Sequence, residues 1–321
     1  MWPMRGLAQR LVFLVLSTIL LTSISATTPG NAAVITFPGA RPFKLFVPSS
    51  YNKDRPAPLI LALHGYSQSG NKLEKYLRLT PVAQTRGILY VYPDGTADRA
   101  GNRFWNATPE CCDFAAKKIN DDAYLISIIN DVEKKYSVDP ARIYIIGHSN
   151  GGFMANRMAC DHADRIAAVV SLAGATFSSP SACKPNAPIS ILQIWGTSDE
   201  TYKINHILGK VIPGAVKTTA SWAKLDRCAK KVVKLPTKLD LERKIKGDET
   251  TVSEYQGCPV GTDVELWTIA GGKHVPAISK TFASDVVDFL LAHPKKLSSD
   301  LPSNDSGTAL SEITILSGVS R

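Results

Sequence analysis

The chain has 321 residues, of which 44% are hydrophobic and 20% charged, and its formal net charge is +9 at pH 7. This length and apolar content suffice for a full hydrophobic core, and α/β folds of this size often form a single domain. No nucleic-acid-binding motif accompanies the positive charge, so we exclude a nucleic acid as partner.

The first 33 residues follow the order of a secretory signal peptide. Arg5 and Arg10 precede an apolar run from 11 to about 24, and small residues follow that run. The run is too short to span a bilayer, so we expect no membrane span once the leader is removed. We therefore expect a secreted protein, extracellular or periplasmic, and leave residues 1–33 out of the fold.

Alternating strand and helix patterns predict one α/β domain over residues 34–294. Strands that alternate with crossover helices and are apolar on both faces indicate a mostly parallel central sheet with helices on both faces. The first two strands suit an antiparallel edge. The expected strands are 34–37, 43–47, 58–63, 88–92, 142–147, 167–173, 189–195 and 264–269, and the expected helices are 122–136 (with Asp121 as N-cap), 151–160, 214–226 and 278–292.

Two further segments differ from this pattern in composition. Residues 224–246 hold nine Lys or Arg against three acids. Such a run is typical of a solvated face, and the alternative is binding of an anionic polymer or a membrane surface. Residues 295–321 are Ser-rich and weakly periodic, so we interpret them as a flexible C-terminal tail.

The cysteines predict disulfides rather than a metal site, because the chain is expected to be exported and no pair has the CxxC spacing of zinc ligands. Adjacent Cα atoms lie only about 3.8 Å apart across a trans peptide, below the usual disulfide range, so we expect Cys111 and Cys112 to have separate partners. The sequence leaves the pairing open. The six cysteines are Cys111, Cys112, Cys160, Cys183, Cys228 and Cys258.

Residues 147–151, Gly-His-Ser-Asn-Gly, fit the G-x-S-x-G nucleophile elbow. An expected strand precedes the motif and an expected helix follows it, as the elbow requires. Ser149 is therefore the candidate nucleophile, and the following helix N-terminus favours developing negative charge. The alternative interpretation is an ordinary tight turn.

A serine needs a base to take its proton, and the base needs a third group to orient it. Asp199 follows the expected strand 189–195 and His274 follows the last strand, so Ser149, acid and histidine occur in the order that this architecture has. Glu200 is the alternative acid, but Asp199 follows the Gly-Thr-Ser turn directly. The other histidines, which we interpret as loop-shaping, surface or helix-end residues, are His64, His148, His162, His206 and His293.

Ester hydrolysis also needs donors for the oxyanion of the tetrahedral intermediate. The His-Gly-Tyr segment after the strand 58–63 offers the backbone N–H of Tyr66. The residue after the nucleophile, Asn150, offers the second N–H. No cofactor and no metal is expected for this chemistry.

Seven motifs together resemble the secreted esterases grouped as polyhydroxybutyrate depolymerases and feruloyl or acetyl xylan esterases, within the α/β-hydrolases. The resemblance covers about residues 40–293. It implies Ser149, Asp199 and His274 as the catalytic triad, with the same two oxyanion donors. The motifs are "LHGYSQS", "YPDGT", "FWNATPECC", "INDDAYL", "VDPARIYIIGHSNGG", "IWGTSDETY" and "VELWTIAGGKH".

The resemblance further implies a disulfide between Cys228 and Cys258. The chain departs from the family in two places: Trp195 stands before Gly196 where a histidine is frequent, and the usual aromatic residue after the catalytic histidine is missing. That aromatic residue would help to wall the pocket. The candidates to line the cleft in its place, or to pack in the core, are Tyr66, Trp105 and Trp195.

These observations predict a secreted serine esterase like the polyhydroxybutyrate depolymerases, acting on a small or polymeric ester through an acyl-enzyme. The alternative is a feruloyl or acetyl xylan esterase acting on plant polysaccharide. A serine peptidase is less favoured, because the loop 200–214 is too short for an added lid or propeller domain. A non-catalytic binding module is also less favoured, because no triad member is missing.

Overall fold

A computed structural model describes residues 31–201, 206–207 and 209–296. The expected leader and the expected tail lie almost entirely outside these residues. Among the residues that are described, no helix is both long and apolar enough to cross a membrane.

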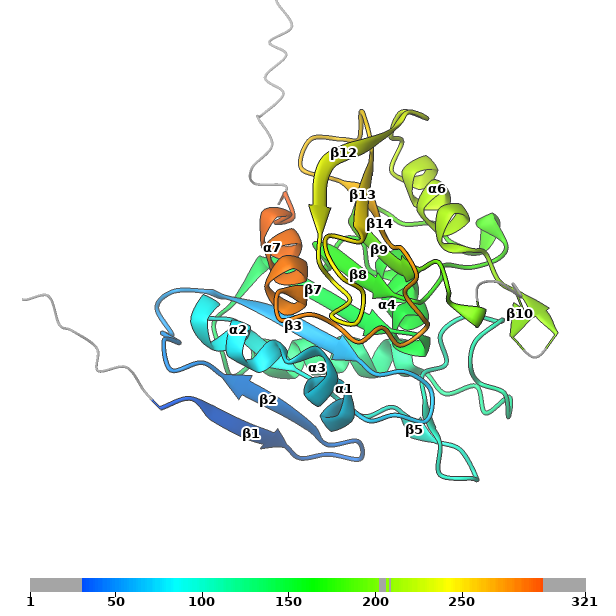
Figure 1. The fold of residues 1–321 in the computed structure, drawn as a ribbon. Coiled ribbons are helices and arrows are strands. Elements are labelled where there is room, and N and C mark those ends of the chain that lie inside the picture. The colour runs from blue at the N-terminus through cyan, green and yellow to red at the C-terminus, as the bar shows by residue number, and fades with distance from the viewer. Residues whose placement is uncertain (1–30, 202–205, 208, 297–321) are drawn as a thin grey trace, which may run out of the picture.

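A ten-stranded sheet forms the centre of the molecule, in the order β1-β2-β4-β3-β7-β8-β9-β14-β13-β12 (Figure 1). The inner strands from β4 to β14 are all parallel, whereas β1, β2 and β13 run antiparallel to their neighbours. This confirms the predicted mostly parallel sheet with an antiparallel N-terminal edge. The strands are β1 (Ala33–Phe37), β2 (Phe43–Val47), β3 (Ala57–Leu63), β4 (Leu89–Val91), β7 (Val138–His148), β8 (Ala168–Leu172), β9 (Ser190–Gly196), β12 (Val232–Leu239), β13 (Thr250–Tyr255) and β14 (Val264–Ile269), with two small hairpins β5 (Thr96–Ala97) and β6 (Arg103–Phe104), and β10 (His206–Ile207) and β11 (Lys210–Val211).

Helices cover both faces of this sheet, as predicted. Strand β3 shows why, because every residue from 57 to 63 is buried and successive side chains point to opposite faces. Two hydrophobic clusters result, one on each side of the sheet. The first contains α3 (Asp121–Glu133), α4 (Asn150–Asp161) and α6 (Ala215–Leu225), and the second contains α1 (Gly70–Leu77), α2 (Leu79–Arg86) and α7 (Phe282–Ala292); a short 3₁₀ turn, η1, spans Pro180–Ala182.

The sequence did not predict the two small hairpins, the 3₁₀ turn η1, the short helices α1 and α2, or the strands β12 and β13. The two helices have only eight residues each, too few for a clear helical period. Strand β12 forms the outer edge of the sheet and lies within the basic segment, whose nine Lys and Arg residues are all exposed. Lysines and Pro236 on an open edge oppose pairing with another chain, which agrees with a solvated face.

Two disulfides join segments that are distant in the sequence. Cys228 and Cys258, the pair that the resemblance implies, link the segment after α6 to the segment before β14. Cys160 and Cys183 link the last turn of α4 to the segment after η1, a pairing that the sequence left open.

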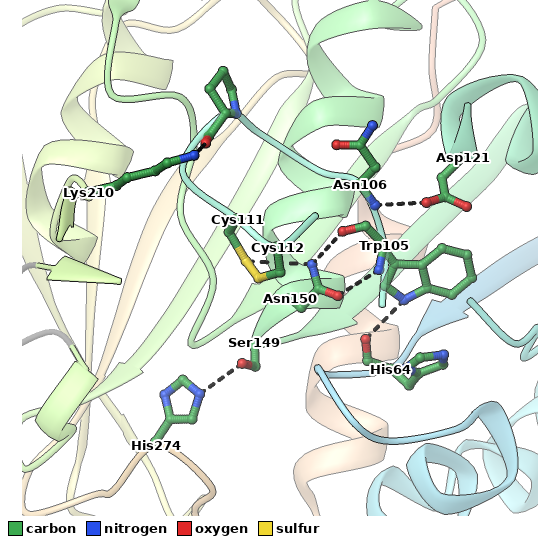
Figure 2. The surroundings of a disulfide bond; sticks show 11 residues. His64, Trp105, Asn106, Cys111, Cys112, Asp121, Ser149, Asn150, Lys210 and His274 are labelled. Carbon is green, nitrogen blue, oxygen red and sulfur yellow. Dashed lines mark hydrogen bonds between the residues drawn. A yellow bond between two sulfur atoms is a disulfide. The ribbon is translucent and has the colours of Figure 1, made fainter. Parts of the chain in front are cut away.

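The third disulfide joins the neighbours Cys111 and Cys112, so the expectation of separate partners is wrong. That expectation assumed a trans peptide, but the peptide bond between them is cis and the two Cα atoms lie 3.0 Å apart. Both side chains are buried. The amide Nδ2 of Asn150 donates to Cys111 Sγ at 3.5 Å, so this disulfide packs beside the residue that follows Ser149 (Figure 2).

Candidate active site

Ser149 occupies a sharp turn between β7 and α4. Its φ is 53° and its ψ is −119°, a conformation that costs a non-glycine residue free energy and that recurs at functional sites. The turn needs glycine on both sides, because a Cβ on Gly147 would overlap the carbonyl of Gly151, and a Cβ on Gly151 would overlap the carbonyl of Leu63. The N–H of Ser149 donates to the carbonyl of Leu172 at 2.8 Å, which fixes the turn to β8.

The structure brings Ser149, His274 and Asp199 together. The Nε2 atom of His274 lies 2.8 Å from Ser149 Oγ, and its Nδ1 atom lies 2.9 Å from Asp199 Oδ2 (Figure 2 shows the first contact). The Asp199 side chain is fully buried and that of His274 is 29% exposed. With the Nδ1 proton donated to the carboxylate, Nε2 is free to accept the hydroxyl proton, which is the arrangement of a serine hydrolase.

Two parallel strands position the acid and the histidine. Strands β9 and β14 are paired up to Gly196 and Ile269, so the loops that follow them start side by side at the same edge of the sheet. The N–H of Thr197 then donates to the carbonyl of Ile269, and the N–H of Ser198 donates to the carbonyl of Gly272. Glu200, the alternative acid, is exposed, whereas the buried carboxylate of the preceding residue contacts the imidazole.

His148, which the sequence suggested only as a loop-shaping residue, supports the histidine of this cluster. Its Nε2–H donates to the carbonyl of His274 at 3.0 Å, and the two rings lie 5.6 Å apart. Burial lowers the pKa of His148 to about 4, so this ring is neutral at pH 7. His148 occupies the first variable position of the G-x-S-x-G motif, and nothing in the sequence indicated its hydrogen bond to His274.

The loop after β3 lies directly against the nucleophile. A Cβ on Gly65 would lie 3.3 Å from the Cβ of Ser149. Within the described parts of the chain, no acceptor takes the backbone N–H of Tyr66 or that of Asn150. Both donors are therefore available to an incoming oxygen, as an oxyanion hole requires.

Two hollows flank the loop after β3. The Tyr66 hydroxyl donates to Asp98 at 2.9 Å, and its ring packs edge-on against Phe114 with the ring centroids 5.3 Å apart. The first hollow, of about 170 Å³, is lined by Tyr66, Asp98, Phe104, Cys112, Phe114 and Ala115. The second, of about 190 Å³, is lined by Gly65, Gln68, Lys72, Leu73, Tyr76, His148 and Val275.

The three aromatic candidates for the cleft have different places. Tyr66 lines the first hollow. Trp105 is fully buried in the core, and Trp195 is half-buried with its indole N–H donated to Thr268 Oγ1 at 3.2 Å. Among the described residues, no group of three His, Cys, Asp or Glu side chains is placed to hold a metal ion.

Comparisons with known proteins show the family of the chain. The model of the esterase PHB depolymerase family matches residues 42–204, half of the chain. Feruloyl esterase B of Piromyces equi is 30% identical over 243 residues, which cover 73% of this chain but only 42% of that enzyme. Feruloyl esterase D of Neurospora crassa is 26% identical over 299 residues, which cover 85% of this chain and 92% of that enzyme.

The fold has a counterpart among solved structures. The acetyl xylan esterase from Aspergillus awamori superposes with a TM-score of 0.57 at 13% identity, over 82% of this chain and 100% of that one. At this identity the likeness concerns the α/β-hydrolase fold alone. By its sequence match, the chain belongs to the esterase PHB depolymerase family, whose members are carboxylic ester hydrolases.

Proposed function

We propose that this chain is a secreted serine esterase that hydrolyses carboxylic esters through an acyl-enzyme on Ser149. The observation that carries the proposal is the chain of contacts from Ser149 Oγ to His274 and on to Asp199, at 2.8 and 2.9 Å. Export is supported by the leader-like order of residues 1–33 and by three disulfides, which persist in oxidising compartments.

The proposed reaction has two steps. Ser149 Oγ attacks the ester carbonyl while His274 takes the hydroxyl proton, and Asp199 holds the resulting imidazolium. The backbone N–H groups of Tyr66 and Asn150 bind the oxyanion of the tetrahedral intermediate. His274 then gives its proton to the leaving alcohol. In the second step the same imidazole deprotonates the water that attacks the acyl-enzyme, and it returns this proton to Ser149 Oγ as the acid leaves.

For the acyl group we propose an aryl acid of the feruloyl type, attached to a polysaccharide. The aromatic lining of the hollow beside Tyr66 supports it, because rings of Phe104 and Phe114 pack well against another ring. The names of the two fungal relatives point the same way. The second candidate is a hydroxyalkanoate polymer, which the name of the matching family favours.

Hydrolysis assays with matched variants test the proposal. We expect wild-type protein to cleave p-nitrophenyl acetate and methyl ferulate, and Ser149→Ala to lose at least about a thousandfold in kcat/KM while remaining folded. Ser127→Ala, which changes an exposed serine on α3, is the control and should keep full activity. A serine-directed phosphonate that labels another residue, or activity in Ser149→Ala, would contradict the triad.

A second set of assays separates the two acyl groups. Phe114 is 43% exposed, so Phe114→Ala removes one wall of the hollow with little loss of core packing. We expect kcat/KM to fall for methyl ferulate and to stay within about twofold for p-nitrophenyl acetate, because burying part of an aryl ring contributes about 1 kcal/mol or more. Hydrolysis of polyhydroxybutyrate films in preference to methyl ferulate would instead favour the polymer.

A further inference from the structure

Trp105 bonds to both segments that carry the proposed oxyanion donors. Its indole N–H donates to the carbonyl of His64 at 3.0 Å, two residues before Tyr66. Its backbone N–H donates to Asn150 Oδ1 at 2.7 Å, and its carbonyl accepts from Asn150 Nδ2 at 2.9 Å. Figure 2 shows these hydrogen bonds from Trp105 to His64 and to Asn150.

The hydrogen bonds of Trp105 join two segments just beyond the last residue pair between β3 and β7. The last residue pair between β3 and β7 is Leu63 with Gly147, so the ladder holds the two strands together only up to that point. Beyond it, the chain turns into the loop of Tyr66 on one side and into the elbow on the other. An oxyanion needs both N–H groups within about 2.7–3.1 Å of one oxygen, so the spacing of these two loops has to be fixed by something other than the ladder.

Trp105 is itself held in place. Its side chain is fully buried, and its ring lies 5.1 Å from the His64 ring. The N–H of the next residue, Asn106, donates to Asp121 Oδ2 at 2.7 Å, and Asp121, also fully buried, pairs with Arg41 at 2.6 Å. Because these contacts fix Trp105, its hydrogen bonds can set the positions of the two loops.

We propose that Trp105 is a positioning residue that sets the distance between the two oxyanion donors. The inference rests on the proposed function, since it concerns the same site. Trp105 does not touch the reacting atoms; it acts through the carbonyl of His64 and the side chain of Asn150. Its loss should weaken binding of the transition state while leaving binding of the ground-state ester almost unchanged.

Trp105→Phe and Trp222→Phe form a matched pair for the test. Trp222 is also fully buried, and its indole N–H donates to Asn156 Oδ1 at 2.6 Å, about two turns along α4 from Ser149. Both substitutions remove one indole N–H bond and a similar buried volume. A merely structural role would therefore affect the two variants alike.

We would measure kcat and KM for p-nitrophenyl acetate, the Kd of a boronic acid that forms a tetrahedral adduct with serine, and Tm. For Trp105→Phe we expect kcat to fall about tenfold to a hundredfold with KM within about twofold, and the boronic acid Kd to rise by the same factor as kcat falls. For Trp222→Phe we expect a comparable fall in Tm with kcat and Kd unchanged. Asn150→Asp, which replaces the Nδ2 donor by a carboxylate, should behave like Trp105→Phe if the latter does not fold.

The outcomes separate this inference from the proposed function. Wild-type protein that neither hydrolyses esters nor binds the boronic acid would contradict the proposed function, and this inference with it. Wild-type activity with unchanged kcat and Kd in folded Trp105→Phe, or equal losses in both tryptophan variants, would contradict the positioning role alone.

Discussion

The neutral ring of His148 holds the backbone of His274 through a hydrogen bond of 3.0 Å from Nε2–H to the carbonyl. Burial lowers the pKa of His148 from 6.5 to about 4. The folded protein therefore excludes a proton that the unfolded chain takes up below pH 6.5. Above pH 6.5 His148 is neutral in both states and does not change the free energy of unfolding. As pH falls from 6.5 towards 4, it destabilises the folded state progressively.

His148→Gln tests this linkage, because glutamine does not titrate and keeps a donor for the carbonyl of His274. We expect the stability of the variant relative to wild type to rise as pH falls, by about 2 kcal/mol between pH 7 and pH 4.5. Thermal unfolding of both proteins across this range measures it. A difference in Tm that does not change with pH would contradict a lowered pKa.

The acid of the triad can be identified by a pair of neighbouring substitutions. Asp199→Asn should lower kcat by about a thousandfold or more, because the amide no longer stabilises the imidazolium or the required tautomer of His274. Glu200→Gln should leave kcat within about twofold, because its side chain is exposed. Steady-state kinetics at pH 7 to 9 decide between them, and a larger loss in Glu200→Gln would reassign the acid.

The disulfide between Cys228 and Cys258 closes a loop with a sequence separation of 30. In the chain-entropy model, such a cross-link stabilises the fold by roughly 3 to 4 kcal/mol. We expect the double variant Cys228→Ser, Cys258→Ser to unfold at a Tm lower by about 6 to 12 °C, with kcat retained. Non-reducing peptide mapping of the wild type should recover these two cysteines linked, and a different partner for either would refute the pairing.

Asp226 ends α6 with its carboxylate buried, and burial raises its pKa to about 7. The N–H of Ile189 donates to Oδ1 at 3.2 Å, whereas Oδ2 has no hydrogen-bond partner among the described residues. The folded protein holds a proton that the unfolded chain releases near pH 4. The free energy of unfolding therefore falls as pH rises from about 4 to 7, and above pH 7 it stays at this lower value.

Asp226→Asn removes this charge at nearly constant volume. We expect almost no change in Tm at pH 4 and a gain of about 1 to 3 kcal/mol in the free energy of unfolding at pH 8. Asp240→Asn, which changes an exposed acid, is the control and should give no pH-dependent difference. An equal effect of Asp226→Asn at both pH values would contradict a pKa that is raised on folding.

The small size of the hollows next to the loop after β3 predicts a preference for short chains among linear acyl groups. The two hollows next to the loop after β3 hold about 170 and 190 Å³, below the range of roughly 300–1,000 Å³ that is usual for ligand clefts. Additional methylenes then stay in water and forgo the roughly 0.8 kcal/mol that each gains on full burial. Measured kcat/KM for p-nitrophenyl esters should peak at two to four carbons, and a maximum at eight or more would indicate a lipase-like site.

The sequence by itself determined eight of the ten strands of the central sheet, the elbow and the order of the proposed triad. Each of these depends on a local pattern: runs of branched residues bury both faces of a strand, and two glycines permit the turn at Ser149. The loop positions of Asp199 and His274 followed, because parallel strands place their C-terminal loops along one edge.

The tertiary structure decided which side chains meet across these loops. Asp199 rather than Glu200 contacts the imidazole, and Trp105 bonds to both His64 and Asn150. Each of these contacts joins segments that are far apart in the chain. The disulfide between the neighbouring cysteines Cys111 and Cys112 was likewise not predicted from the sequence. Local patterns fix where an element begins, but burial and contact with distant residues fix what each side chain touches, and those arise only once the chain has folded.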